Sequence, residues 1–512
     1  QGYNIFFYDD YPSLIRGGHN FSIIRASESD CLCHEEEVEI IVALNQDTVD
    51  RHIGDLRPGG VIIYDKDNVE AQGIGVPMDQ IVKEHSGIPI MRNTAAIGAL
   101  GALLDIGFDS VEEIIGATVK KALEVNIAIA RKAYDTIERR GVFPVPSTGR
   151  KALPLVTGNE AIALGAVRGG LDLYIAYPMT PASSILHFLA DHGERLGVTT
   201  VHPESEIGAA LMVIGAAYGG KRAMTGTSGG GFALMTEAIS LSAQSETPMV
   251  IVECQRTGPS TGVPTYTMQA DLKFCLGAGH GDVQRIVMAP GDAVEAYEWS
   301  YHALNAAWYF QVPVLLLSDK HLSESAFSFK EPGPLPEWPG IKIWENNDGP
   351  YNRYMATGDG ISPMAFPGTK GATVKATSYE HDEYGITAED AKAVQFMQEK
   401  RLRKAKAIRD HFKGMKTIKE YGPEDSDVVL IFWGSTKGAA VEACKGLGIR
   451  SIQPIVLEPF PEEGLKALLR GARKVLCAET NATGQLSCLL RCYGIEVHET
   501  ILRYDGRPFT PK

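Results

Sequence analysis

Two carboxylates stand at the start of a predicted helix of small residues. The stretch His202–Pro203–Glu204–Ser205–Glu206 is followed by Ile207, Gly208 and two alanines. The helix dipole stabilises an acidic side chain in the first turn by about 0.3–1 kcal/mol, so a purely structural role is one interpretation. The other is a buried carboxylate whose small neighbours let a planar ring pack closely. The spacing alone does not choose between Glu204 and Glu206.

A second polar segment, Tyr177–Ser184 (YPMTPASS), follows a short apolar run. Its two prolines restrict the backbone and predict a tight corner between a strand and a helix. Thr180 presents a hydroxyl group at that corner. The alternative is that Thr180 or the serines after it serve only as the N-cap of the helix.

A glycine-rich turn, Ser228–Gly231, lies between a predicted strand and a predicted helix. Such a turn lets the backbone approach a ligand closely, and the helix after it can hold an anion at its N-terminus. It is not a GxxxxGK[ST] phosphate loop, because no lysine follows. On its own the turn identifies no ligand.

Arg256 follows an apolar run, residues 248–253, that we interpret as a buried strand. A guanidinium group at the end of a strand suits bidentate binding of a carboxylate. The alternative is an ion pair with Glu253 or Asp271.

The elements that must position these groups alternate between strand and helix. Such alternation predicts a doubly wound, mostly parallel sheet, which binds ligands at the carboxyl ends of its strands. We predict strands at 173–177, 199–202, 222–227, 249–253, 283–289 and 313–317, and helices at 158–170, 183–196, 203–218 and 232–245.

The flanking regions predict two further α/β domains. The first has strands at 37–44 and 61–65, a turn at 58–60, and helices at 93–106 and 111–138. The last has strands at 428–432, 452–456 and 474–478, and follows an irregular stretch and a long charged helix at 388–415. We therefore expect domains at 1–140, 154–330 and 426–512, a linker at 141–153 rich in Pro, Gly and basic residues, and a connector at 331–425.

Composition excludes several classes of protein. The 512 residues are 44% hydrophobic and 22% charged, as in soluble globular proteins of about three domains. The sequence contains no run of about 18 uncharged apolar residues, which a membrane span would need, and no secretory signal is visible. We therefore expect a cytoplasmic protein. The net charge of −14 argues against a nucleic-acid partner. The chain opens as if already inside a domain, so we expect native residues to be missing before Gln1.

The eight cysteines include a CxC at Cys31 and Cys33 and a pair at Cys488 and Cys492. Neither spacing matches the four-cysteine runs that hold iron–sulfur clusters. Free thiols are the expected state.

Together these segments resemble the alpha subunits of 2-oxoacid:ferredoxin oxidoreductases, especially the 2-oxoglutarate type with a gamma domain fused at the front. The resemblance covers nearly the whole chain, although the glycine-rich strand–turn–helix with which a gamma domain normally begins is not seen. It is carried by Leu14–Ser27 (with RGGH), Gly158–Ala163 (GNEAIA), Tyr177–Ser183, Thr227–Phe232 with Gly230 in place of a usual proline, Arg256–Thr265 (RTGPSTGVPT) and Leu502–Thr510 (LRYDGRPFT).

The resemblance implies that the central domain binds the aminopyrimidine of thiamine diphosphate and that the last domain is similar to the C-terminal domain of transketolase. Glu206 resembles the family's catalytic glutamate, which hydrogen-bonds a ring nitrogen of the cofactor, and on this ground it is preferred to Glu204. Thr180 and Arg256 would bind the 2-oxoacid. Cofactor contacts would come from Tyr177, Pro178, Glu206, Ser228 and Gly229.

The implied reaction is the oxidative decarboxylation of 2-oxoglutarate to succinyl-CoA, or its reverse, with coenzyme A as co-substrate. Gly358–Asp359–Gly360 looks like the start of the metal–diphosphate motif of thiamine enzymes, but no Asn stands at 380–392 to complete it, so we predict a turn. A separate beta subunit would therefore hold the diphosphate, Mg2+ and a [4Fe-4S] cluster, pass electrons to ferredoxin, and form a dimer of alpha–beta heterodimers with this chain.

Several alternatives remain open at this point. The substrate can instead be pyruvate or a branched-chain oxoacid. A lipoamide-dependent dehydrogenase is disfavoured by the RGGH segment, and a plain nucleotide-binding protein by the lack of a GxGxxG or GKS turn. A non-catalytic scaffold subunit is disfavoured by the presence of Glu206, Thr180 and Arg256.

Overall fold

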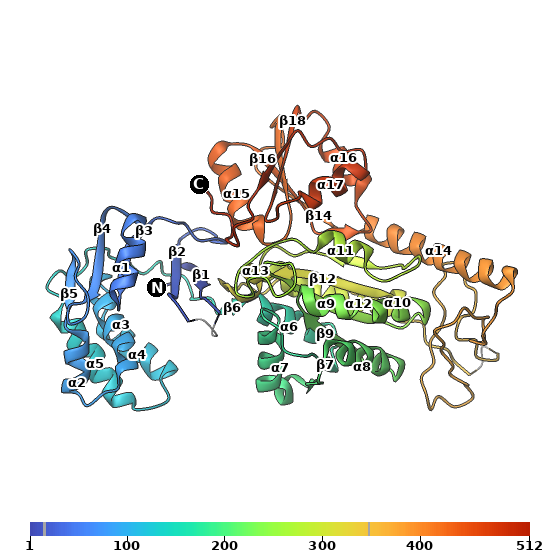
Figure 1. Cartoon of the computed structure of the whole chain (residues 1–512), viewed down its shortest axis with the longest axis horizontal. Coiled ribbons are helices and arrows are strands. Elements are labelled where there is room, and N and C mark those ends of the chain that lie inside the picture. Colours follow the sequence, from blue (N-terminus) through green and yellow to red (C-terminus); the bar gives the residue numbers. More distant parts are fainter. Residues whose placement is uncertain (14–16, 347–348) are drawn as a thin grey trace.

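Strands that alternate with helices build most of the chain, for which the computed structural model describes residues 1–13, 17–346 and 349–512. In these residues the strands form four sheets, three of them mainly parallel. Figure 1 shows a front unit at the left, a central unit, a last unit above it, and an irregular arm at the right. The predicted α/β class is confirmed.

The central sheet carries the strands that precede the candidate residues. Its strand order is β17-β11-β12-β10-β9-β7-β8, and every neighbouring pair except β11–β17 is parallel. Every residue of β9, β10 and β12 is buried, as expected for parallel strands covered on both faces. The strands are β7 (Leu173–Ile175), β8 (Thr199–Val201), β9 (Ala223–Thr227), β10 (Met249–Gln255), β11 (Ile286–Met288), β12 (Pro313–Asp319) and β17 (Val456–Glu458).

Helices cover both faces of this sheet, as the doubly wound prediction requires. Because successive strand residues point to opposite faces, Val250 and Val252 pack with α6, α7 and α12, whereas Met249 and Ile251 pack with α8, α9, α10 and α11. The helices are α6 (Gly158–Arg168), α7 (Ser183–Leu196), α8 (Glu206–Tyr218), α9 (Gly229–Leu234), α10 (Thr236–Gln244), α11 (Leu272–Gly277), α12 (Ala293–Phe310) and α13 (Lys320–Glu324).

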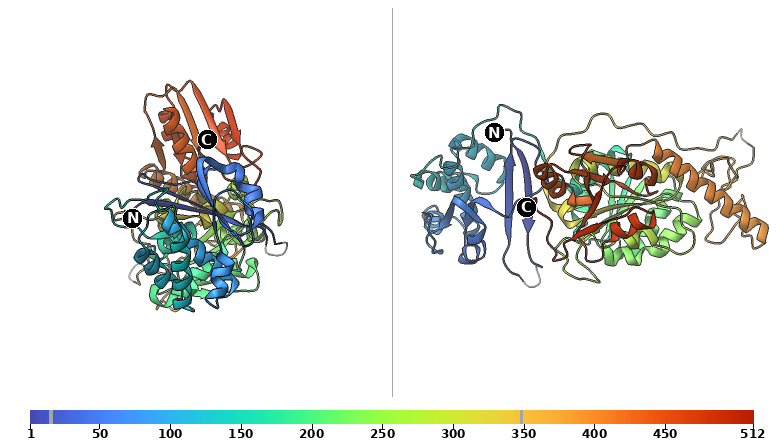
Figure 2. Two further views of the ribbon diagram at one scale, coloured as in Figure 1. Left: turned by 90° about the vertical axis from the view of Figure 1, so that its left-hand side faces the viewer. Right: turned by 90° about the horizontal axis from the view of Figure 1, so that it is seen from above.

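The first hairpin of the chain shares a sheet with the central unit. β1 (Asn4–Asp10) pairs antiparallel with β2 (Phe21–Ser27) and with β13 (Ala326–Ser328), and β13 pairs with β6 (Leu155–Thr157). This sheet crosses the domain boundary predicted between residues 140 and 154. The hairpin is therefore bonded directly to the unit that carries the candidate site, and Figure 2 shows it between the front unit and the central one.

The front unit has a small parallel sheet covered by helices. β4 lies between β3 and β5. Three helices, α3, α4 and α5, pack around the apolar core that this sheet shares with α2. The elements are β3 (Val38–Ala43), β4 (Leu56–Asp65), β5 (Ile74–Val76), α1 (Gln46–His52), α2 (Met78–Glu84), α3 (Arg92–Leu103), α4 (Phe108–Thr118) and α5 (Leu123–Thr136).

The last unit is built on a sheet of order β14-β16-β15-β18-β19, parallel except at β14. Directly after β16 the chain contributes β17 to the central sheet, so the two units share a continuous segment. The elements are α14 (Ala391–Lys413), β14 (Ile418–Tyr421), β15 (Val428–Phe432), α15 (Lys437–Leu447), β16 (Arg450–Pro454), α16 (Glu462–Leu468), β18 (Lys474–Glu479), α17 (Gln485–Cys492) and β19 (Glu499–Leu502).

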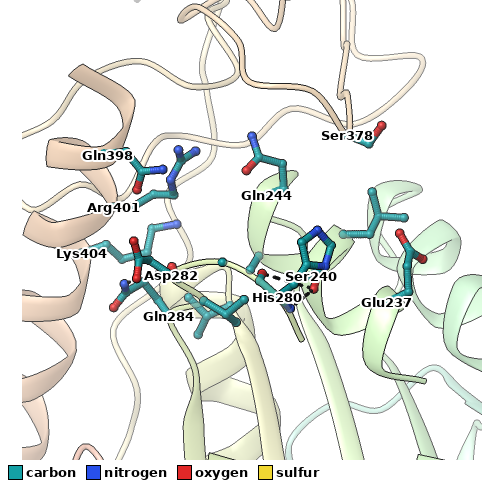
Figure 3. Close-up of a pocket in the computed structure, with 15 residues that line it drawn as sticks. Glu237, Ser240, Gln244, His280, Asp282, Gln284, Ser378, Gln398, Arg401 and Lys404 are labelled. Carbon is teal, nitrogen blue, oxygen red and sulfur yellow. Dashed lines mark hydrogen bonds between the residues drawn. The ribbon is translucent and has the colours of Figure 1, made fainter. Parts of the chain in front are cut away.

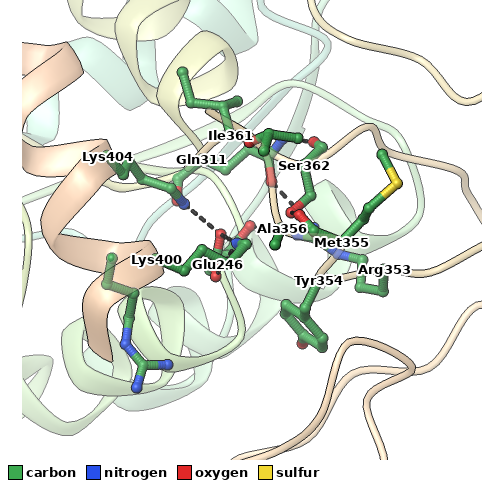
Figure 4. Close-up of polar contacts among 12 residues, drawn as sticks. Glu246, Gln311, Arg353, Tyr354, Met355, Ala356, Ile361, Ser362, Lys400 and Lys404 are labelled. Atoms are coloured by element: carbon green, nitrogen blue, oxygen red, sulfur yellow. Dashed lines mark hydrogen bonds and ion pairs between the residues drawn. The ribbon is translucent and has the colours of Figure 1, made fainter. Parts of the chain in front are cut away.

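A buried ionic network fixes the arm and α14 to the amino edge of the central sheet (Figure 4). Glu246 accepts hydrogen bonds from Lys400 Nζ at 2.7 and 2.8 Å and from Lys404 Nζ. Arg353 donates to the side chain of Gln311 at 3.0 Å and to the backbone carbonyl of Glu246. Burial opposes ionisation of Glu246, but the two ammonium groups outweigh it and hold its pKa well below the ordinary value.

Some predicted elements have different bounds. The predicted turn at 58–60 lies inside β4. The single helix predicted at 111–138 is two helices, because Ala122 takes a left-handed φ of 48° between them. The helix predicted at 232–245 is likewise divided at Met235. Hydrophobic periodicity does not reveal a break of one to four residues.

None of the helices in the described ranges is both long and apolar enough to cross a bilayer. All eight cysteines are free thiols, and six of them are buried.

Candidate cofactor and substrate site

The predicted site residues come together at the carboxyl edge of the central sheet. Thr180 follows β7, Glu206 follows β8, Ser228 follows β9 and Arg256 follows β10. These four strands are neighbours in the order β10-β9-β7-β8. The crevice at this edge is where open α/β sheets bind ligands.

The corner after β7 is held by a residue that the sequence did not single out. Asn159, fully buried at the start of α6, donates to the carbonyl of Pro181 at 2.8 Å and to the hydroxyl of Ser184 at 2.7 Å. The Thr180–Pro181 peptide is cis. The N-cap of α7 is Ala182, which makes no side-chain cap, so the capping alternative for Thr180 is wrong. The only sequence signal for Asn159 was its place in the GNEAIA segment.

Glu206 is the first residue of α8, whose N-cap Ser205 accepts from the backbone N–H of Gly208 at 3.1 Å. Its side chain is buried, with 6% exposure, whereas Glu204 is exposed. Among the described residues neither carboxylate oxygen of Glu206 has a hydrogen-bond or ion-pair partner. This geometry favours Glu206 over Glu204 as a ligand-binding carboxylate, because a buried carboxylate is stable only with a donor.

Gly231 allows the glycine-rich turn to lie against Glu206. A Cβ at this position would lie 2.2 Å from Thr227 Oγ1 and 2.7 Å from Glu206 Cγ. The sequence predicted a close approach to a ligand at this turn. What the structure shows is a close approach to the side chain of Glu206, and this contact had no sequence signal beyond the run of glycines.

Ser228 stands at the N-cap position of α9 but makes no side-chain cap. Its side chain is fully buried, and its Oγ has no hydrogen-bond partner among the described residues. A buried hydroxyl without a partner in a native structure requires an explanation, and a ligand at this edge provides one.

Arg256 reaches back to the corner after β7. Its Nη1 donates to the backbone carbonyl of Thr180 at 2.8 Å, while its Nε is buried without a partner. No ion pair joins Arg256 to Glu253 or Asp271 in the described structure, so that alternative is wrong. Burial lowers the pKa of Arg256, and the nearby Glu253 opposes this effect. Arg256 and Thr180 are thus adjacent, with guanidinium N–H groups left for an anionic ligand.

Two further carboxyl groups lie behind the glycine-rich turn. Both carboxyl oxygens of Glu253 are buried without a partner. Burial, followed by repulsion from Asp271, raises the pKa of Glu253 well above its ordinary value, and burial raises that of Asp271 to about 6. Burial thus favours the uncharged form of Glu253, the carboxyl group nearest to Arg256 on β10.

The unpartnered side chains of Glu206 and Ser228 fit the aminopyrimidine ring of the thiamine diphosphate that the sequence resemblance implies. A buried carboxylate at Glu206 and a buried hydroxyl at Ser228 suit the ring nitrogens of an aminopyrimidine. The described residues contain no group of three or more His, Cys, Asp and Glu side chains that could hold a metal ion. Asp359, in the GDG segment, instead accepts from Lys342, from the hydroxyl of Thr357 and from the N–H of Ile361, which confirms the predicted turn.

A cavity of about 240 Å³ lies elsewhere (Figure 3). It is bordered by α10, α14 and residues 280–284, which precede β11. It therefore lies at the amino edge of the sheet, opposite the candidate site, and contains none of the predicted site residues. Of the segment Leu14–Ser27, which contains RGGH, residues 14–16 lie outside the described residues.

Comparison with known proteins gives a consistent picture. Residues 164–400 match the family model described as pyruvate flavodoxin/ferredoxin oxidoreductase, thiamine diP-bdg, and residues 1–136 match the model described as pyruvate ferredoxin/flavodoxin oxidoreductase. The chain is similar to subunit alpha of 2-oxoacid:ferredoxin oxidoreductase 2 from Aeropyrum pernix, with 32% identity over 99% of this chain and 91% of the relative. It is also similar to the 2-oxoglutarate oxidoreductase subunit KorA of Mycobacterium tuberculosis, with 29% identity over 98% and 84%.

Among solved structures, the chain is similar to the 2-oxoglutarate:ferredoxin oxidoreductase from Magnetococcus marinus with 2-oxoglutarate, coenzyme A and succinyl-CoA bound. The TM-score is 0.90 and the identity 32%, over 100% of this chain and 92% of the other. The two family models and these relatives indicate the same family, and the residues at the carboxyl edge of the sheet are consistent with it. The chain belongs to the family of 2-oxoacid:ferredoxin oxidoreductase alpha subunits.

Proposed function

We propose that this chain supplies the aminopyrimidine half of a thiamine diphosphate site in an enzyme that oxidatively decarboxylates 2-oxoglutarate to succinyl-CoA, or runs the reverse reaction. The observation that carries the proposal is Glu206, a buried carboxylate without a partner at the carboxyl edge of a doubly wound sheet. Thiamine diphosphate, when bound, would supply a carbon nucleophile for the keto group and an electron sink for the electron pair left behind when carbon dioxide leaves.

Glu206 would hold the protonated form of a ring nitrogen of the cofactor by a charge-assisted hydrogen bond. A carboxylate with no other partner is free to do so, and the low exposure of the Glu206 side chain strengthens such a bond. Tyr177, Pro178, Ser228 and Gly229 would form the remaining wall around the ring. Tyr177 is partly exposed and contacts His202 edge to face at 5.9 Å, so its ring borders the crevice.

Arg256 and Thr180 would bind and orient the carboxylate of the 2-oxoacid. The guanidinium group is held by the Thr180 carbonyl, which fixes its direction, and the adjacent hydroxyl has no hydrogen-bond partner among the described residues. Because no ion pair joins Arg256 to Glu253 or Asp271 in the described structure, the positive charge of Arg256 stays available for an anion.

A partner subunit would complete the site. Exposed apolar side chains lie on α8, which begins with Glu206, and on α9, which begins with the glycine-rich turn: Ile207, Leu211, Met212 and Leu234 are between 41% and 52% exposed. Such a patch around an incomplete site is typical of a protein interface. The partner would be a beta subunit that holds the diphosphate, Mg2+ and a [4Fe-4S] cluster and donates electrons to ferredoxin, in a dimer of alpha–beta heterodimers.

The choice of 2-oxoglutarate is supported by relatives rather than by a specific contact. The solved relative was determined with 2-oxoglutarate and succinyl-CoA bound, and a 2-oxoglutarate synthase subunit KorA from Methanocaldococcus jannaschii is 33% identical over 63% of this chain and 87% of its own length. The broader name 2-oxoacid:ferredoxin oxidoreductase is carried by the Aeropyrum relative, so substrate selectivity must be measured.

The test coexpresses the chain with its beta partner under anaerobic conditions and follows viologen reduction with coenzyme A and either 2-oxoglutarate or pyruvate. We expect Glu206→Gln to lower kcat by about 10²- to 10⁴-fold, the usual contribution of a positioned acid–base group. Glu204→Gln is the matched control, because this exposed glutamate lies two residues earlier, and its kcat should be unchanged.

Normal activity in Glu206→Gln would show that another carboxylate serves the cofactor. Higher kcat/KM with pyruvate than with 2-oxoglutarate would contradict the proposed substrate. No activity with any 2-oxoacid would favour a scaffold role for the chain.

A further inference from the structure

We propose that the C-terminal tail, residues 503–512, positions the Arg256 loop, residues 256–267, through Arg507 and Asp10. The inference deepens the proposed function, because it rests on a substrate-binding role for Arg256. Arg507 and Asp10 act as positioning residues in it, since each reaches Arg256 only through Tyr266 and Thr257.

The first step is how Arg256 is tied to the returning limb of its own loop. Thr257, the next residue, donates its backbone N–H to the carbonyl of Tyr266 at 3.0 Å. Its hydroxyl lies 3.2 Å from the carbonyls of both Tyr266 and Thr267. Residues 258–263, by contrast, are exposed. The position of Arg256 therefore depends on the position of Tyr266.

The second step is that Tyr266 is held from outside the loop. Its hydroxyl donates to Asp10 Oδ1 at 3.3 Å, and the guanidinium carbon of Arg507 lies 3.8 Å from the centre of its ring. Arg507 Nε is also 3.2 Å from Asp10 Oδ2. A guanidinium over an aromatic face is attractive, so both the ring and the hydroxyl of Tyr266 are fixed.

The third step is the burial of Asp10 at the end of β1. Its side chain is 4% exposed, and it also accepts from the hydroxyl of Tyr8 at 3.1 Å. One carboxylate thus joins the front hairpin, the Arg256 loop and the tail. Loss of Arg507 removes a charged partner from a buried carboxylate, which weakens the whole connection.

The backbone of the tail also lies close to the Arg256 loop. Thr267 N–H donates to the carbonyl of Gly506 at 3.2 Å. Gly506 has a φ of +81°, and a Cβ there would lie 3.2 Å from Tyr266 Cβ and 3.3 Å from Thr257 Oγ1. The tail therefore lies against both sides of the base of the loop. Figures 1 and 2 show the C-terminus beside the β1–β2 hairpin.

The first test measures hydrogen exchange in the 512-residue chain without any partner or ligand. In Arg507→Met we expect the amides of Thr257, Val263 and Thr267 to exchange about tenfold faster, which corresponds to about 1.4 kcal/mol. Arg503→Met is the matched control, because Arg503 lies in the same tail but pairs with Glu36 and Asp505. Unchanged exchange in Arg507→Met would overturn the inference.

The second test uses the complex with the beta partner and compares KM with kcat. Arg507→Met should raise KM for the 2-oxoacid about tenfold with kcat within about twofold, and Arg507→Lys, which keeps the charge, should restore part of the loss. Arg256→Lys serves as the reference. If Arg256→Lys raises KM and Arg507→Met does not, the tail inference is wrong. If Arg256→Lys leaves KM unchanged, the proposed role of Arg256 is wrong, whatever the exchange data show.

Discussion

The two edges of the central sheet differ in whether their buried carboxyl groups have bonding partners. At the amino edge, Glu246 is bonded to Lys400 and Lys404, and its backbone carbonyl to Arg353. At the carboxyl edge, both carboxyl oxygens of Glu253 are buried without a partner, and the buried side chain of Glu206 makes no hydrogen bond or ion pair among the described residues. The difference is one of partners and not of burial.

This contrast separates groups that hold the fold together from groups kept for a ligand. A buried charge is expensive unless it is paired, so a chain that needs a carboxylate only for structure provides its cations, as at Glu246. A carboxylate left unpaired at a ligand-binding edge weakens the free chain but gives a bound ligand a strong partner. Variants at the two edges should therefore separate stability from activity.

The largest effect on stability is expected at Glu246. Glu246→Gln leaves two buried lysines without their counter-charge and should lower the free energy of unfolding by about 3–5 kcal/mol. Glu206→Gln removes no internal contact and should change it by less than about 1 kcal/mol. Urea unfolding of the full chain, followed by circular dichroism, measures both. Equal losses in the two variants would break the contrast between the edges.

A smaller effect is expected at the glycine-rich turn. Gly231→Ala places a methyl group against Thr227 and Glu206 and should cost about 1–3 kcal/mol, the usual result of overpacking. It should also displace Glu206 and lower activity. Gly230→Ala is the matched control, because a Cβ there meets nothing within 4 Å. Loss of activity in both variants would mean that the turn needs flexibility and not space.

The contribution of Glu253 to the free energy of unfolding should depend on pH. Its folded pKa lies well above its ordinary value, so the folded chain keeps a proton that the unfolded chain releases above about pH 4. The contribution of Glu253 to stability is full below that pH and falls as pH rises, by about 1.4 kcal/mol per unit, until the folded pKa is reached. Glu253→Gln should therefore be at least as stable as the parent at pH 8, and its relative stability should decrease toward pH 4.

The contribution of Glu246 to stability changes with pH in the opposite direction, because the pKa of Glu246 is depressed in the folded chain. Its contribution is full above the ordinary pKa of a glutamate and falls as pH decreases. Denaturant midpoints at pH 5 and pH 8 for both variants test the two slopes together. A destabilised Glu253→Gln at pH 8 would show that the ionised carboxylate has a partner in the folded chain.

The sequence predicted the elements around the site well, because buried parallel strands are short apolar runs bounded by glycine and proline. The bounds of α7 and β15 agree with the prediction to the residue. Residues whose importance depends on distant contacts were not predictable. Asn159 matters because it meets a corner more than twenty residues later, and Glu246 because α14 returns to it.

Pairing of the front hairpin with β13 and β6 was hidden for the same reason. Strand pairing across some 320 residues leaves no local pattern, so the hairpin was assigned to the front domain. At Arg256 the sequence left two partners open, and the structure uses a third, the Thr180 carbonyl. Residue types and spacing thus located the site, but not the contacts that orient it.

The smallest effect is expected at Ser228, and it tests the contrast most sensitively. Its buried hydroxyl has no partner among the described residues, so Ser228→Ala removes a desolvated polar group and should leave the free energy of unfolding within about 1 kcal/mol of the parent, or raise it. If the hydroxyl bonds the cofactor, the same variant should need about five- to tenfold more thiamine diphosphate for half-maximal activity in the complex, the loss of about 1–1.5 kcal/mol. Thr225→Ala is the matched control, because its hydroxyl is equally buried and unpartnered but lies three residues earlier, within β9. A raised cofactor requirement in Ser228→Ala alone would show that the orphaned group at the edge serves the ligand, and no change in either variant would show that an unpartnered hydroxyl is not by itself a sign of function.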